Sequence, residues 1–272
     1  MDGYKHYFIG GDTHCGHLVG LTPPQWQIKK KKDCDTKRSK WYKIAIQLWN
    51  AFAKELMYLP YKFDGIFLNG DLVEGKGKRS GGTELITTDM QEQSSMAVAV
   101  INYIRRYAKP KAPIILTYGT PYHTDTEGDE WENIVARKAA VTKIGAHEWV
   151  DANGLIVDLK HHIPTSAVPY SRFTAVSRDA LWNELWALVN MQPKADLIVR
   201  SHAHYYVSCE DSRKAAMVLP ALQGMGSKFG AKRCSALVDW GFVVLHVKNK
   251  DVWNFTKHLR RIEAQKPKVV KL

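Results

Sequence analysis

The chain has 272 residues, and 45% of them are hydrophobic, which is enough for a buried core and excludes a disordered protein. No run reaches the roughly 18 apolar residues that span a bilayer, and the N-terminal residues lack a signal-peptide layout, so we expect a cytoplasmic protein with no membrane partner. The 39 Lys and Arg against 27 Asp and Glu give a net charge of +12, which suits a polyanionic partner.

Segments with the apolar pattern of strands alternate along the chain with segments that have the pattern of helices, which predicts an α/β protein. Short runs that stop at turn residues predict strands at residues 4–9, 65–69, 113–118, 154–160, 196–200, 236–247 and 251–258. Apolar residues spaced by three and four predict helices at residues 41–58, 89–107, 130–141 and 177–190. In the last helix we expect Leu181, Leu185 and Leu188 to face the core. No repeat or linker divides the chain, so we expect one domain over residues 1–272.

Five of the expected strands end in groups of side chains that can bind metals. The groups are Asp12-Thr13-His14, Asn69-Gly70-Asp71, Gly119-Thr120-Pro121-Tyr122-His123, His161-His162 and Ser201-His202-Ala203-His204. Ligands of open α/β sheets bind beyond the carboxyl ends of the strands. We therefore expect the five groups to meet in one pocket, although they lie far apart in the sequence.

The residue types and their spacing fit a site for two divalent ions. Asp12 and His14 are two residues apart, as are His202 and His204, so each pair would point the same way in an extended segment. Carboxylate and imidazole without thiolate suit borderline divalent ions. Asp71 can offer one oxygen to each ion, and two ions ~3.5–4 Å apart can activate a water and neutralise a phosphoryl group. One such pair alone is commonly structural, and the ordered set of five favours a metal site.

The order of these groups resembles the signature of the calcineurin-like metallophosphoesterase superfamily, which reads DxH, GDxx, GNH[DE], a lone His and GHxH. The resemblance spans residues 12–204. It implies an αββα sandwich of two facing mixed sheets flanked by helices, and a metal-dependent phosphoesterase with two divalent ions. We expect Mn²⁺, with Fe, Zn, Ni and Co as alternatives. The resemblance implies that the first metal is held by Asp12, His14, Asp71 and His204, and the second by Asp71, His161 and His202.

The third group departs from the family pattern, because it has Thr120 and then His123 where relatives have Asn followed directly by His. That Asn is a metal ligand in the family, so either Thr120 or His123 would replace it here. We expect His123 to act as the general acid and Asp71 to be the second catalytic residue. Asp125 would either orient His123 or be a solvated loop residue. The GTPxH variant resembles members encoded by phages and prophages, which would place the protein in the cytoplasm of a host cell.

Two adjacent histidines, His161 and His162, compete for one ligand position. We favour His161 as the ligand, as in relatives with the HHxP pattern. His162 would then be a neighbour of the metal or a contact to phosphate.

Two basic segments follow the first two groups, and we expect both to be insertion loops. Residues 18–40 contain a lysine-rich run, and residues 75–82 contain Lys76, Lys78 and Arg79, which we expect to contact substrate. Positive charge beside a metal pocket favours a nuclease that hydrolyses phosphodiesters of DNA or RNA with a metal-activated water. The alternatives are a protein or small-molecule phosphomonoesterase and a non-catalytic scaffold with the same fold.

Overall fold

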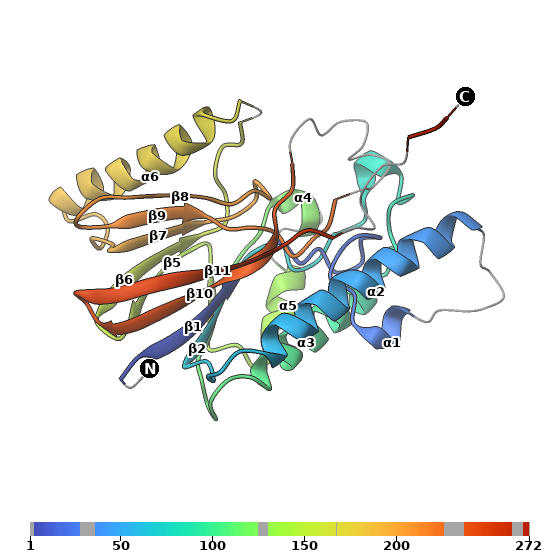
Figure 1. Ribbon diagram of the computed structural model, residues 1–272, viewed down its shortest axis with the longest axis horizontal. Coiled ribbons are helices and arrows are strands. Elements are labelled where there is room, and N and C mark those ends of the chain that lie inside the picture. Colours follow the sequence, from blue (N-terminus) through green and yellow to red (C-terminus); the bar gives the residue numbers. More distant parts are fainter. Residues whose placement is uncertain are drawn as a thin grey trace.

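The computed structural model describes residues 3–27, 36–124, 130–166, 168–225, 237–262 and 269–271. Two mixed sheets face each other, with helices on the outer side of each (Figure 1). This architecture is the expected αββα sandwich. In the described ranges, no helix combines the length and the apolar character that a membrane crossing requires.

The first sheet has six strands in the order β11-β10-β1-β2-β3-β4. Strands β1 to β4 are parallel, whereas β10 is antiparallel to both β1 and β11. The bounds are β1 Lys5–Gly10, β2 Gly65–Asn69, β3 Ile114–Thr117, β4 Lys143–Gly145, β10 Trp240–Asn249 and β11 Val252–Arg260. Because β1, β2 and β3 run the same way, the segments that follow them start at one edge of the sheet.

The second sheet has five strands in the order β5-β6-β7-β9-β8. Here β6, β7 and β9 are parallel, and β5 and β8 are antiparallel edge strands. The bounds are β5 His147–Ala152, β6 Leu155–Lys160, β7 Leu197–Arg200, β8 Val207–Glu210 and β9 Ala215–Val218. The sequence patterns did not predict β4, β5, β8 or β9.

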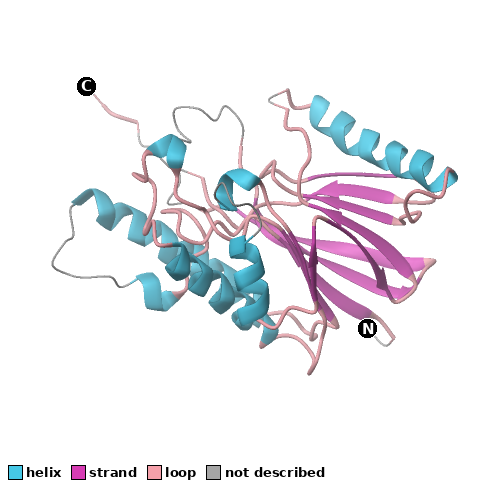
Figure 2. Cartoon of the chain, turned by 180° about the vertical axis from the view of Figure 1, so that it is seen from behind, coloured by secondary structure: helices cyan, strands magenta, loops and turns pink. Residues whose placement is uncertain are grey.

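Helices cover the two sheets unequally. The first sheet packs against α2 Thr36–Met57, α3 Met90–Arg105 and α5 Glu130–Lys138, whereas α6 Ser171–Leu188 is the one described helix that lies over the second (Figure 2). Short helices α1 Pro24–Gln27 and α4 Pro121–Thr124 and the 3-10 helix η1 Lys78–Ser80 lie in connecting segments. Asp89 begins α3 as expected, since its carboxylate accepts from the backbone N–H groups of Gln91 and Glu92.

Alternation along the strands builds three apolar layers. Side chains of successive strand residues point to opposite faces. On β1, Tyr7 and Ile9 therefore pack between the sheets, while Phe8 joins the core beneath the helices. On β7, Val199 faces the first sheet and Ile198 packs under α6.

Two sequence predictions are wrong in detail. Helix α6 begins at Ser171 instead of residue 177, and Leu181, Leu185 and Leu188 are 59%, 42% and 76% exposed instead of buried. Residues 18–40 are not one loop, because they contain α1 and the start of α2, with residues 28–35 outside the described part. The start of this segment is firmly packed, since Val19 and Leu21 are buried.

Candidate metal centre

The centre forms where strands of both sheets end. Asp12 and His14 follow β1, and Asp71 follows β2, both in the first sheet. Backbone hydrogen bonds join these two segments, from the N–H of Asp12 to the carbonyl of Gly70 at 3.0 Å and from His14 to Asp71 at 3.0 Å. In the second sheet His161 follows β6, and the segment after β7 carries His202 and His204. The topology thus brings together residues up to 192 positions apart in the sequence, from Asp12 to His204.

The backbone at the centre is unusual. In the described residues, nine non-glycine residues have a positive φ, and five of these are the expected ligands Asp12, His14, Asp71, His202 and His204. Such conformations cost energy and cluster at functional sites. The extended geometry that we expected for the Asp12/His14 and His202/His204 pairs is wrong. The left-handed turns direct these side chains inward instead.

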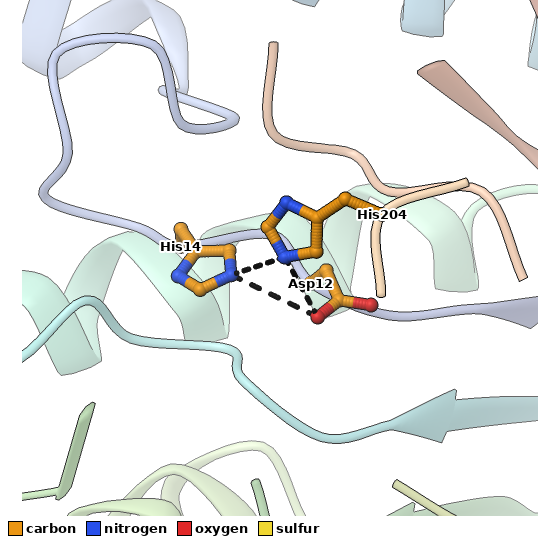
Figure 3. Close-up of side chains that lie close together, drawn as sticks. All are labelled: Asp12, His14 and His204. Carbon is orange, nitrogen blue, oxygen red and sulfur yellow. Dashed lines mark hydrogen bonds and ion pairs between the residues drawn. The ribbon is translucent and has the colours of Figure 1, made fainter. Parts of the chain in front are cut away.

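The first group contains Asp12, His14 and His204 (Figure 3). Nε2 of His204 lies 3.2 Å from Oδ1 of Asp12 and 3.1 Å from Nε2 of His14. Nε2 of His14 is 3.8 Å from the same Asp12 oxygen. Two ligands that each lie 2.0–2.1 Å from one ion are about 3.0–3.4 Å apart at tetrahedral or octahedral angles. Two of the three spacings in this group fall in that range, and the third, between His14 and Asp12, is longer.

The second group contains Asp71, His161 and His202. Oδ2 of Asp71 lies 3.0 Å from Nε2 of His161 and 4.0 Å from Nδ1 of His202. The same oxygen is 4.0 Å from Nε2 of His14, so it faces both groups. Oδ1 is instead engaged by Thr120, whose backbone N–H donates to it at 2.7 Å. Oδ2 is thus the Asp71 oxygen that the printed distances place near both groups, and the expectation that Asp71 offers one oxygen to each ion stays a prediction.

Two atoms in the centre lack the partners that burial demands. Among the described residues, Oδ1 of Asp12 and Nε2 of His161 are buried without a hydrogen-bond partner. A buried polar atom left unsatisfied costs roughly 1–3 kcal/mol. The two atoms lie 4.0 Å apart, and a cation coordinated by them would remove this cost. The residues present therefore fit bound metal ions.

Hydrogen bonds at the far side of two rings fix which nitrogen faces the centre. Nδ1 of His161 donates to the backbone carbonyl of Asn69 at 2.7 Å, so Nε2 is the nitrogen that faces the centre. Nδ1 of His14 lies 2.7 Å from Oε2 of Glu74, which is buried and accepts its proton. Such partners are typical of histidines that bind metals. Glu74 was missed from the sequence, where its position three residues after Asp71 was the available signal.

The electrostatics of the centre favour positive charge. Burial raises the pKa values of Asp12 and Asp71, but the surrounding imidazoles outweigh it and hold both below the usual range. Burial likewise lowers the pKa of His14, yet Asp12 and Glu74 raise it to about 10. The pKa of His161 is raised to about 9, mainly by Asp71 against the effect of burial. The carboxylates of the centre therefore stabilise positive charge beside them, either as protons on the imidazoles or as metal ions.

The third sequence group reaches the centre through both Thr120 and His123. The hydroxyl of Thr120 lies 3.2 Å and 3.3 Å from the two oxygens of Asp71. Nδ1 of His123 donates to the backbone carbonyl of Glu74 at 2.9 Å, and its Nε2 is 3.8 Å from Oδ2 of Asp71. The ring of His123 packs edge-on against His14, with centroids 4.6 Å apart. Burial lowers the pKa of His123.

Residues of α3 and α5 hold the loops of the centre in place. The side-chain oxygen of Gln93 accepts from the backbone N–H groups of Glu74 and Gly75, at 3.1 Å and 2.9 Å. Glu132 accepts from the N–H of Gly119 at 2.7 Å and from that of Leu72, and burial raises its pKa to about 7. Both residues were missed, because nothing in an amphipathic helix pattern marks a side chain that braces a distant loop.

The remaining expected residues lie outside the two groups. His162 is exposed, with its ring 5.0 Å from that of His202, whereas His161 is 2% exposed and belongs to the second group. Lys76 and Lys78 are exposed on the segment that begins at Gly75. Asp125 and the side chain of Arg79 lie outside the described residues.

Fold and site together define an αββα protein with a centre of Asp and His suited to divalent cations. No family model and no curated protein matches the chain. Among solved structures, Vps29 from Chaetomium thermophilum is 14% identical with a TM-score of 0.47, over 96% of this chain and 91% of that one. Zinc-complexed Vps29 from Entamoeba histolytica is 10% identical, with a TM-score of 0.46 over 93% and 91% of the chains. Yfce, a phosphoesterase from E. coli, is 10% identical, with a TM-score of 0.41 over 88% and 90%. At these values the likeness assigns no activity to this chain.

Proposed function

We propose that this protein is a binuclear-metal phosphoesterase of the calcineurin-like type, with phosphodiesters of nucleic acid as its preferred substrate. One observation carries the proposal. Oδ1 of Asp12 and Oδ2 of Asp71 lie between two groups of imidazole nitrogens, and each oxygen is within 4.0 Å of nitrogens from both groups. Histidines that only pack in a core need not surround two carboxylate oxygens in this way.

Each residue then has a definable task. Asp12, His14 and His204 would hold one ion, and Asp71, His161 and His202 the other. When bound, a pair of divalent ions supplies a nucleophilic water at neutral pH and stabilises charge on a phosphoryl group. Oδ2 of Asp71 would keep the two sites together, while Thr120 holds the other oxygen of that carboxylate.

His123 is suited to act on the leaving group. Its Nδ1 is engaged by the carbonyl of Glu74, so Nε2 is the nitrogen directed at the centre. The lowered pKa of this imidazole disfavours the protonated form before substrate arrives. A bound phosphate ester places negative charge beside the ring, which raises the pKa and favours the proton that the departing oxygen needs. Direct ligation through Nε2 is the alternative role.

The basic segment after Asp71 supports a polyanionic substrate. Gly75 packs so closely on His123 that an added Cβ would lie 2.5 Å from the carbonyl oxygen of that residue. The exposed Lys76 follows directly, and Lys78 is exposed two residues later. Positive charge at this rim, in a chain of net charge +12, would attract nucleic acid and make turnover decrease with salt.

Hydrolysis of bis-p-nitrophenyl phosphate and of p-nitrophenyl phosphate, with Mn²⁺ and with chelator, tests the proposal. We expect Mn²⁺-dependent turnover of the diester that is abolished in Asp71→Asn, followed by salt-sensitive cleavage of single- or double-stranded DNA. Turnover of the monoester alone would replace the phosphodiesterase by a phosphatase. Full activity in Asp71→Asn, or protein that binds no metal and cleaves neither ester, would refute the assignment and favour a scaffold.

A further inference from the structure

Of the helices that the structure describes, α6 alone covers the outer face of the second sheet, on the side opposite α2, α3 and α5 (Figures 1 and 2). The apolar layer beneath it is small, and α6 contributes only Ala175 and Val176 to its buried part. The third buried residue of the helix is Asn183, whose amide bonds Pro193 and Ala195. Because so few of its side chains are buried, most of the surface of α6 is exposed to solvent.

That outer surface of α6 is apolar. Successive helix residues are rotated by about 100°, so Leu181, Leu185 and Leu188 form a stripe on the side away from Val176 and Asn183. Trp182 and Val189 flank the stripe and are 51% and 62% exposed. Soluble monomers rarely leave a contiguous apolar surface of this kind uncovered.

Charge is nearly absent from this stretch. Between residues 181 and 191 the one charged side chain is Glu184. It is paired with Lys194 at 3.2 Å and with Lys214, which holds it beside the sheet. The sequence pattern predicts that these three leucines face a core. Among the described residues they belong to none of the three apolar clusters.

We propose that this surface pairs with a second copy of the chain, through two α6 helices packed antiparallel about a twofold axis near Leu185. The large apolar side chains on the stripe and its flanks are at least 42% exposed, namely Leu181, Trp182, Leu185, Leu188 and Val189. At about 100 Å² each they offer roughly 500 Å² per copy, so a pair would bury about 1,000 Å² in total, the lower end for a specific interface.

The charge pattern fits a twofold pair. In the antiparallel arrangement the exposed Arg178 would lie opposite the C-terminal end of α6 in the second copy. That end has no basic residue in its last turn, and the carbonyl groups at the C-terminal end of a helix carry partial negative charge. In a twofold contact, the same patch of each copy faces itself. A stripe without charged side chains allows this without electrostatic repulsion. The pairing leaves the metal centre untouched, so it is independent of the proposed function.

Sedimentation equilibrium of the full chain, from about 1 to 100 µM, tests the pairing. We expect a dimer that Leu185→Glu converts to a monomer and that Arg178→Glu weakens at least tenfold in Kd. Met57→Glu, a matched change at a residue 60% exposed on α2, should leave the dimer intact. A wild-type monomer at 100 µM, or a dimer that survives Leu185→Glu, would overturn the proposal.

A covalent test covers the case in which Leu185→Glu fails to fold by circular dichroism. Leu185→Cys, placed next to the twofold axis, should form a disulfide-linked dimer on mild oxidation, and Met57→Cys should not. Absence of the Leu185→Cys dimer, or equal crosslinking of both variants, would contradict the pairing. A dissimilar protein bound at this stripe while the chain itself stays monomeric would also contradict it.

Discussion

Oε2 of Glu74 lies 2.7 Å from Nδ1 of His14, and this contact determines which nitrogen of His14 faces the centre. The carboxylate accepts the proton of Nδ1 and directs Nε2 at His204 and Asp12. Glu74 also lies 3.5 Å from Nδ1 of His123 and accepts from the same ring through its backbone carbonyl. One residue therefore orients two imidazoles of the centre.

Replacing Glu74 by Ala should weaken Mn²⁺ binding about 10–100-fold, the usual effect of losing a hydrogen-bond partner of a metal-binding histidine. Glu74→Gln should lose less, since its amide oxygen can still accept from His14. Isothermal titration with Mn²⁺ measures both. Glu55→Gln is the matched control, because Glu55 pairs with His258 in a similar carboxylate–histidine contact between α2 and β11. Unchanged Mn²⁺ affinity in Glu74→Ala would show that Glu74 does not support the metal-binding histidines.

Residue 119 must be glycine because the carboxylate of Asp71 lies too close to it for a side chain. An added Cβ would lie 2.0 Å from Oδ1 of Asp71, so Gly119→Ala must displace that carboxylate. We expect loss of Mn²⁺ binding and of phosphodiester turnover, measured side by side. Gly81→Ala serves as the control, since a Cβ there meets nothing within 4 Å, although its φ of +59° makes the change mildly destabilising. A Gly119→Ala protein with normal metal affinity would contradict the geometry.

The metal-binding groups could be predicted from the sequence because each follows an apolar strand that is easily recognised. Asp12, His14, Asp71, His161, His202 and His204 fall into two of the three groups of potential ligands that the described residues form, and the third group is His14, Glu74 and His123. Glu74, Gln93 and Glu132 could not be predicted in the same way, since their roles depend on which loops the fold places beside them. Helix α6 shows the opposite failure, in which a clear apolar stripe predicts burial and the structure exposes it.

Arg200 ties the second sheet to α6 and should dominate the stability of that region. Its guanidinium is 2% exposed and bonds Asp158 and Asp179, each at 2.7 Å. Removing one partner of a buried charge pair leaves uncompensated charge and costs about 3–5 kcal/mol. We expect Arg200→Met to lower the free energy of unfolding in urea by this amount. Arg213→Met, at an exposed ion pair with Asp211, should change it by less than about 1 kcal/mol.

His246 should make the protein less stable in acid. Burial, together with the neighbouring His6 and His258, lowers its pKa from 6.5 to about 4, and Nδ1 of His6 lies 2.8 Å from Nδ1 of His246. The unfolded chain therefore binds the proton first as the pH falls. Stability is fully present above pH 6.5 and is lost towards pH 4, at no more than about 1.4 kcal/mol per pH unit from this residue.

Urea unfolding of His246→Gln between pH 7 and pH 4, in chelator so that metal ligands contribute equally, checks this assignment. The variant should show a shallower loss of stability than the wild type below pH 6.5. Parallel pH profiles for the two proteins would show that His246 does not titrate on unfolding.

The central claim is that one carboxylate, Asp71, joins two cation sites. Electron paramagnetic resonance of the protein titrated with Mn²⁺ tests it most directly, because two Mn²⁺ ions ~3.5–4 Å apart are magnetically coupled. We expect two ions per chain, with the signal of a coupled pair as the second equivalent binds and its loss in Asp71→Asn. A single isolated Mn²⁺ per chain, or a coupled pair that survives Asp71→Asn, would contradict a binuclear centre bridged by Asp71.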